Sequence, residues 1–182
     1  MKVLKVLGII LITLFGIYVV IAAVAPANLI VEKSTTIDAS SQAVSSHVNC
    51  LDKWPAWSAW QAMDPKMENE YSDNPCGVGA WNSWNGPTSG KGKQTIEEVN
   101  GSESIKMNLV FEGFEGVNYA NWKFDEVDGS TIVSWSFEGA PSPFFFRPIN
   151  LMMKGVLEES YATGLASLKE VVESDSSVED AS

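Results

Sequence analysis

The chain has 182 residues, 45% of them hydrophobic, and carries 12 Lys and Arg against 23 Asp and Glu, a net charge of −11. This length and composition suit one domain with a single buried core. The acidic excess lies entirely after the first 27 residues, where it repels phosphate backbones and anionic head groups, so the charge disfavours a nucleic-acid partner.

An uncharged apolar segment, VLGIILITLFGIYVVIAAVA, runs from Val6 to Ala25. As a helix it spans about 30 Å, the thickness of the hydrocarbon core of a bilayer. Lys2 and Lys5 precede it and no comparable basic cluster follows, so the positive-inside rule keeps the amino terminus in the cytoplasm. We therefore predict an anchor over residues 1–27 in a single-pass inner-membrane protein of a bacterium, with the rest on the non-cytoplasmic, periplasmic side.

A cleaved secretory signal is the alternative to a retained anchor. Ala23-Val24-Ala25 has the small-x-small form of a cleavage site. However, the apolar run is longer than the usual signal core of roughly 7 to 15 residues, and Pro26 sits where cleavage would occur. These two features favour the anchor.

The next segments predict a strand and two short helices. Residues 29–37 alternate in character and are rich in β-branched side chains, as in a first strand. A short helix follows, with Asp38 or Ser40 as its N-cap and apolar residues at spacings of four and three. Pro55 allows at most a fresh turn to begin, so residues 51–60 predict a second short helical piece.

From Lys66 onward the pattern changes to that of antiparallel hairpins. Asn100-Gly101 and Asp128-Gly129 are the dipeptides best suited to the positive φ angles of tight hairpin turns. The segments around these turns alternate with period two, which predicts strands with one apolar face. With the first strand, about seven strands form one antiparallel sheet.

The chain ends in a long amphipathic pattern that predicts a helix lying across the apolar face of the sheet. Residues 174–182 are acidic and polar and predict a disordered tail, which leaves residues 28–173 for the domain. The apolar stripe of the helix consists of Ile149, Met152, Met153, Val156, Leu157, Tyr161, Leu165, Leu168 and Val172.

One strand, two short helices, six strands and a terminal helix make an α+β helix-grip fold, in which a seven-stranded antiparallel sheet wraps around the C-terminal helix. The segments NCLDKWPAWSAWQAMDP, GVGAWNSW, GKGKQTI and TIVSWSFEG, with LMMKG and GLASLKEV near the end, resemble membrane-anchored members of the SRPBCC superfamily. These are the START-like, polyketide cyclase/dehydrase and lipid-transport proteins, and the resemblance spans residues 29–172. It implies a cavity between sheet and terminal helix that binds a lipid or another hydrophobic small molecule.

The tryptophans and their neighbours are the candidate lining of that cavity. Seven indoles exceed what a small core needs, although aromatic side chains also fill ordinary cores. Methionines nearby would adapt to ligands of variable shape. The candidates are Trp54, Trp57, Trp81, Trp84, Met107, Leu109, Phe111, Trp122, Trp135, Phe137, Met152, Met153 and Val156.

Phe144, Phe145 and Phe146 stand between two prolines just before the terminal helix. Burial under the sheet edge is the favoured interpretation, because an exposed triple phenylalanine is a liability. The alternative is a gate to the cavity or an apolar contact with the bilayer.

The sequence offers little for catalysis, and the enzymatic interpretation is the weaker one. His47 is the single histidine, and no catalytic set of the family matches this chain, so we predict no catalytic residues, metal or cofactor. Cys50 and Cys76 match no metal or CxxC motif, and they form either a disulfide or two free thiols.

Three functions therefore remain open. The first is binding, transport or sequestration of a hydrophobic ligand. The second is a cyclase, dehydratase or hydrolase that uses the same cavity with His47 or Tyr119. The third is a membrane-tethered protein-interaction module.

Overall fold

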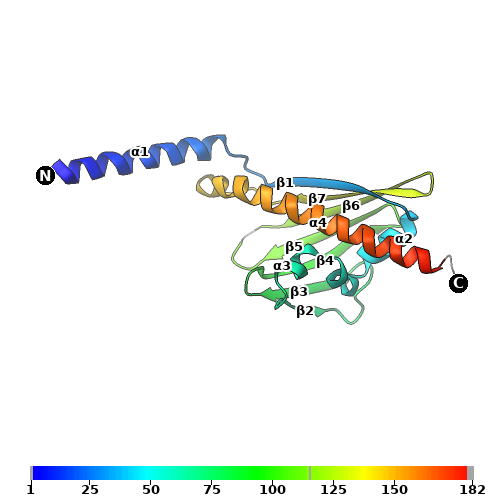
Figure 1. Ribbon diagram of the computed structural model, residues 1–182. Coiled ribbons are helices and arrows are strands. Elements are labelled where there is room, and N and C mark those ends of the chain that lie inside the picture. The colour runs from blue at the N-terminus through cyan, green and yellow to red at the C-terminus, as the bar shows by residue number, and fades with distance from the viewer. Residues whose placement is uncertain (1, 115, 180–182) are drawn as a thin grey trace.

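A computed structural model describes residues 2–114 and 116–179, and it shows an apolar helix projecting from an α+β domain (Figure 1). Helix α1 (Lys2–Val24) is followed by β1 (Ile30–Ile37), α2 (Ser41–Asn49), the 3-10 helix η1 (Leu51–Ala56) and α3 (Ala59–Met63). Six strands come next, β2 (Glu68–Tyr71), β3 (Trp81–Gly86), β4 (Gly90–Asn100), β5 (Ser104–Phe111), β6 (Asn118–Val127) and β7 (Ser130–Glu138). The 3-10 turn η2 (Phe144–Phe146) leads into the long helix α4 (Arg147–Glu179).

The seven strands form one antiparallel sheet in the order β1-β7-β6-β5-β4-β3-β2. From β2 to β7, each strand pairs with the next one along the chain. The first strand, β1, pairs instead with the last, β7, and Ile30 lies opposite Glu138. Asp128 and Gly129 both have positive φ angles, 52° and 84°, as a two-residue turn between β6 and β7 requires. The helix-grip fold and the strand count predicted from the sequence are confirmed.

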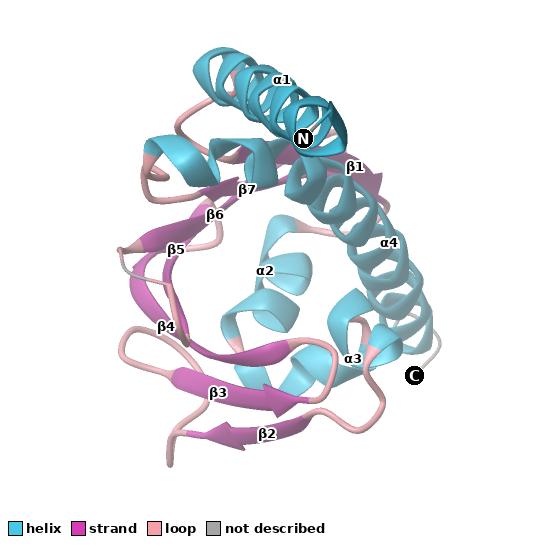
Figure 2. Cartoon of the chain, turned by 90° about the vertical axis from the view of Figure 1, so that its left-hand side faces the viewer, coloured by secondary structure: helices cyan, strands magenta, loops and turns pink. Residues whose placement is uncertain are grey.

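Helix α4 packs along the concave face of the sheet, and α3 lies between α4 and the edge formed by β2 and β3 (Figure 2). Ser40 is the N-cap of α2, and its hydroxyl accepts a hydrogen bond from the backbone N–H of Ala43 at 3.3 Å. The buried side of α4 runs through Leu157, Tyr161, Leu165, Leu168 and Val172, and together with inward residues of β1, β5, β6 and β7 it forms the core.

Helix α4 continues to Glu179, through residues for which the sequence predicted a disordered tail. Two side-chain contacts lie in the region around the expected boundary. Lys169 Nζ lies 3.3 Å from Glu173 Oε1, and Nε2 of His47 in α2 lies 3.5 Å from Asp175 Oδ2. The contact with α2 thus lies beyond Val172, the last apolar position of the helix stripe.

Candidate ligand-binding site between the sheet and α4

Four indoles meet at the centre of the domain. Trp54 and Trp57 come from η1 and the residue after it, and Trp122 and Trp135 come from the adjacent strands β6 and β7. Trp122 and Trp135 stack with ring centroids 4.3 Å apart, and Trp57 meets both edge-on at 5.9 and 6.1 Å. All four are buried, so in this structure they pack against one another, and a cavity bordered by them stays a prediction.

Three of these indoles carry buried N–H groups without a hydrogen-bond partner in the part of the chain that the structure describes. They are Trp57, Trp122 and Trp135, whereas Trp54 Nε1 donates to the carbonyl of Val48 at 3.0 Å. An unpaired buried donor costs about 1–3 kcal/mol. The aromatic centre thus presents donors that an acceptor atom would stabilise.

A second aromatic group lies on the same face of the sheet, towards the end near α1. Trp84, Phe111 and Phe137 follow one another across β3, β5 and β7, with ring centroids 5.6 and 6.4 Å apart. Gly92, opposite Trp84 in β4, makes room for the indole, because a Cβ there would lie 2.2 Å from Trp84 Cζ2. Trp84 and Phe111, like Leu109 beside them, are only half-buried.

Helix α4 does not seal this part of the sheet as it seals the centre. Its stripe is buried from Leu157 onward, but Val156, directly before it, is 48% exposed, and Met153, one turn earlier, is 39% exposed. Met152 is 77% exposed. The inward aromatic row and these uncovered side chains of α4 both lie at the end of the domain near α1. Met107, by contrast, is fully buried in the core.

Buried amides add polar groups to the inward face, and the sequence analysis did not identify them. Asn69 Nδ2 donates to Gln61 Oε1 at 2.8 Å, and Asn82 Nδ2 donates to Asn69 Oδ1 at 3.3 Å. The Oδ1 atom of Asn82 is buried and unpaired among the described residues, and Gln94, its neighbour in β4, is also buried. The sequence WNSWN, residues 81–85, could have indicated this polar group, because the two-residue period of a strand puts Asn82 on the same face as Trp84.

Trp81 was predicted to line the cavity, but it lies on the face of the sheet that points away from α4. It pairs with Thr95, which in turn pairs with Asn108, and these positions alternate with the inward Asn82 and Met107. Lys93 Nζ lies 4.1 Å from the centroid of the Trp81 ring.

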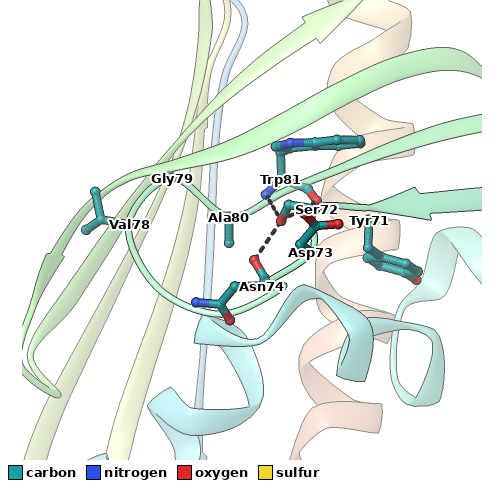
Figure 3. Close-up of a pocket in the computed structure, with 8 residues that line it drawn as sticks. All are labelled: Tyr71, Ser72, Asp73, Asn74, Val78, Gly79, Ala80 and Trp81. Atoms are coloured by element: carbon teal, nitrogen blue, oxygen red, sulfur yellow. Dashed lines mark hydrogen bonds between the residues drawn. The ribbon is translucent and has the colours of Figure 1, made fainter.

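Trp81 instead borders a hollow of about 460 Å³ formed by the loop between β2 and β3 (Figure 3). Ser72 Oγ accepts from the Trp81 N–H at 3.1 Å and donates to the Asn74 carbonyl at 2.7 Å. A second hollow, of about 290 Å³, is lined by Glu68, Glu70 and Lys91 among others. The first hollow has a mainly polar lining, and the second has a mixed lining that includes Trp84. Both are open at the surface and differ from the predicted cavity beneath α4.

Phe144, Phe145 and Phe146 are exposed, which corrects the favoured prediction that they are buried under the sheet edge. They form η2 beside α1, and the hydroxyl of Tyr18 in α1 donates to the carbonyl of Phe145. The Arg147 guanidinium lies 5.6 Å from the centroid of the Phe144 ring.

Cys50 and Cys76 are joined by a disulfide, with their Cα atoms 4.1 Å apart. Backbone hydrogen bonds flank it, from Leu51 N to Pro75 O at 2.9 Å and from Gly77 N to Asn49 O at 3.1 Å. The bridge ties the junction of α2 and η1, and hence the segment that carries Trp54, to the loop before β3. Asp52 lies near both sulfurs, but these are already bonded to each other.

The two candidate catalytic residues of the enzymatic alternative lie apart. His47 is on α2, facing Asp175, and burial together with the positive charge of Lys53 lowers its pKa, against the opposing effect of Asp175. Tyr119 is on the outer face of β6, next to the inward Ala120, with Lys106 Nζ 4.6 Å from its ring centroid. Tyr161, which the sequence placed only in the apolar stripe of the helix, has a buried phenol. Its ring stacks on Trp135, and burial raises the pKa of the phenol.

The curved sheet, the terminal helix and the apolar interior between them define a helix-grip domain. A family model described as polyketide cyclase / dehydrase and lipid transport matches residues 29–173. The chain belongs to this family. No curated protein matches it by sequence.

Solved structures share the fold at low sequence identity. CV1439 from Chromobacterium violaceum is 16% identical with a TM-score of 0.57, over 80% of this chain and 97% of that one. Aha1 from Colwellia psychrerythraea, solved as a dimer, is 15% identical with a TM-score of 0.59, over 79% and 96%. Ara h 8.0201 is 14% identical with a TM-score of 0.55, over 81% and 99%. At these identities the likeness establishes the fold alone.

Proposed function

We propose that the protein binds a hydrophobic small molecule or lipid between the sheet and the first half of α4, for transport or sequestration. The observation that carries the proposal is the half-buried aromatic row of Trp84 and Phe111, at the end of the domain where the apolar stripe of α4 is uncovered at Met153 and Val156. Apolar walls with a few polar groups are typical of small-molecule sites. The Asn82 amide, on the same face of β3 as Trp84, would supply such a polar group.

We further propose that α1 is a retained single-pass anchor and that the domain lies outside the cytoplasm. Its span Val3–Val24 has a mean hydropathy of 2.8 and is almost entirely exposed, which fits a membrane helix or a signal sequence. Lys2 and Lys5 support a cytoplasmic amino terminus. The Cys50–Cys76 disulfide supports an oxidising compartment.

The ligand proposal is tested by titrating the full chain in nanodiscs with oleate, cholesterol and anthracene while following tryptophan emission. At least one ligand should give a saturable change, with an affinity in the micromolar range for about ten buried methylenes. Met153→Trp fills the site from α4 and should abolish the response. Val110→Trp adds the same ring to the exposed outer face of β5 and should respond as the parent does.

Two results would count against binding. If no ligand saturates the signal, the protein-interaction alternative gains, because the aromatic interior then serves packing alone. If Met153→Trp and Val110→Trp respond alike, the site is not beneath α4. The enzymatic alternative would be supported by a chemically altered ligand after incubation, and Tyr161→Phe would then test the buried phenol.

A further inference from the structure

The most exposed apolar surface of the domain lies at its junction with α1. Large apolar side chains of η2 and the start of α4 are exposed there, among them Phe145 at 54%, Phe146 at 57% and Met152 at 77%. A contiguous apolar patch on a protein surface indicates an interaction site. We name this surface, formed by Phe144, Phe145, Phe146, Ile149, Met152 and Met153, the apolar end.

The apolar end lies alongside α1 rather than beyond its tip. The Tyr18 hydroxyl donates to the Phe145 carbonyl, and Tyr18 precedes the last residue of α1, Val24, by six positions. At 1.5 Å per residue this places the contact about 9 Å back from the end of the helix. Figure 1 shows the start of α4 beneath the end of α1.

The connection between α1 and the domain is fixed by hydrogen bonds. The side chain of Asn150, which is buried in the first turn of α4, donates to the carbonyls of Pro26 and Ala27 at 3.0 and 3.2 Å. The Ser142 N–H donates to the Ala27 carbonyl at 2.8 Å. These hydrogen bonds therefore fix the position of η2 along the axis of α1.

The charge of this segment also suits a membrane. Between Gly139 and Leu157 the sequence has no acidic residue, although the chain as a whole carries a net charge of −11. Arg147 and Lys154 are its charged side chains. Basic residues that flank exposed aromatic side chains are typical of segments that lie in the membrane interface.

We propose that η2 and the first two turns of α4 insert into the outer leaflet of the bilayer that α1 spans, and that the ligand enters the domain directly from this leaflet as a lipid. If α1 is the anchor, its last turns lie in that leaflet, and the fixed connection carries η2 to the same depth. Met153 belongs both to the apolar end and to the uncovered part of the α4 stripe, at the same end of the domain as Trp84 and Phe111, so the proposed site would open where the lipid lies. This inference rests on the proposed anchor and deepens the proposed function.

The test uses the full chain in phosphatidylcholine vesicles, labelled with the environment-sensitive dye NBD at Phe145→Cys. The native cysteines are bonded to each other and do not react with the dye. Val127→Cys is the matched control, because Val127 is 53% exposed but lies beside the β6–β7 turn, at the end opposite α1 (Figure 1). The dye at position 145 should emit at shorter wavelength and be quenched several-fold by spin-labelled lipid, and the dye at position 127 should show neither effect.

Flotation of the vesicles separates this inference from the anchor. Protein that floats with its vesicles but whose dye at position 145 remains as solvent-exposed as that at position 127 would overturn the inserted η2 and leave the anchor standing. Protein that does not float would overturn both. Loss of quenching at position 145 in Tyr18→Phe, with flotation retained, would support the role of the hydrogen bond in setting the depth.

Discussion

Trp135 and Tyr161 stack with their ring centroids 3.7 Å apart and their planes inclined by 11°. The pair joins β7 to α4 at the point where the helix stripe becomes fully buried. On the other face of Trp135 lies Trp122, so one aromatic stack connects α4 with two central strands. The position of α4 over the candidate site depends on this stack.

Replacing Tyr161 therefore tests how α4 is held. Tyr161→Leu should lower the free energy of unfolding by about 1–3 kcal/mol, because it loses both ring stacking and buried volume. Tyr161→Phe keeps the ring and should cost less. Urea unfolding followed by circular dichroism measures both, and equal losses for the two variants would contradict a role for the stacking.

Two glycines of α4 form a natural pair for a second test. A Cβ at Gly164 would lie 3.1 Å from Trp135 Cζ3, whereas a Cβ at Gly155 would meet nothing within 4 Å. Gly155→Ala should stabilise the protein by about 0.5–1 kcal/mol through helix propensity. Gly164→Ala gains the same propensity but must displace the indole, so its melting temperature should be lower than that of Gly155→Ala. The reverse order would refute the close packing at Trp135.

The disulfide should contribute measurably to stability. Closing a loop between Cys50 and Cys76 stabilises a fold by about 3 kcal/mol on chain-entropy grounds. The double variant Cys50→Ser, Cys76→Ser should have a free energy of unfolding lower by this amount, measured by denaturant titration. Adding reductant to the parent should reproduce this loss of stability. The double variant is the control, since reductant should not change its stability.

Asp64 should make the stability depend on pH at the acidic end. Its Oδ2 accepts from the backbone N–H groups of Ser89 and Thr88, each at 2.9 Å, and these bonds hold the pKa of the carboxyl below its ordinary value. Because the pKa is lower in the folded than in the unfolded chain, the carboxylate stabilises the fold above the unfolded pKa, and this stabilisation is lost as the pH falls through the folded pKa. Denaturant midpoints measured between about pH 6 and pH 2 should fall more steeply for the parent than for Asp64→Asn. Parallel pH profiles would contradict the assignment.

The proposed topology predicts the behaviour of reporter fusions. A reporter that is active only in the cytoplasm should be silent when fused after Val172, because Lys2 and Lys5 hold the other side of α1 in the cytoplasm. Alkaline phosphatase at the same position should be active. A bright cytoplasmic reporter would reverse the topology and remove the compartment argument for the disulfide.

The sequence was sufficient for the fold because its signals are local. Turn dipeptides such as Asp128-Gly129 and the period-two pattern around them define hairpins without any knowledge of tertiary contacts. The end of α4 was not predictable in this way, since the pairing of His47 with Asp175 joins residues from opposite ends of the domain.

The candidate site was less predictable, because composition does not say which face a side chain occupies. Trp81 and Trp84 are separated by three positions, so in one strand they point to opposite faces, and only the register of β3 with β4 shows which of them faces α4. The exposure of Phe145 had no local signal either. It follows from the placement of η2 beside α1 and outside the core, which only the tertiary structure shows.

The pairing of β1 with β7 has a consequence for how the chain is made. Ile37 lies opposite Thr131, so residues 38–130 must all be synthesised before the two strands can meet. At about 5–20 residues per second this takes roughly 5–20 s. During that time β1 emerges with both edges unpaired, while each later hairpin can close within itself. We therefore expect β1, the first strand to be synthesised, to join the sheet last. Until then, a chaperone must keep β1 from pairing with another chain.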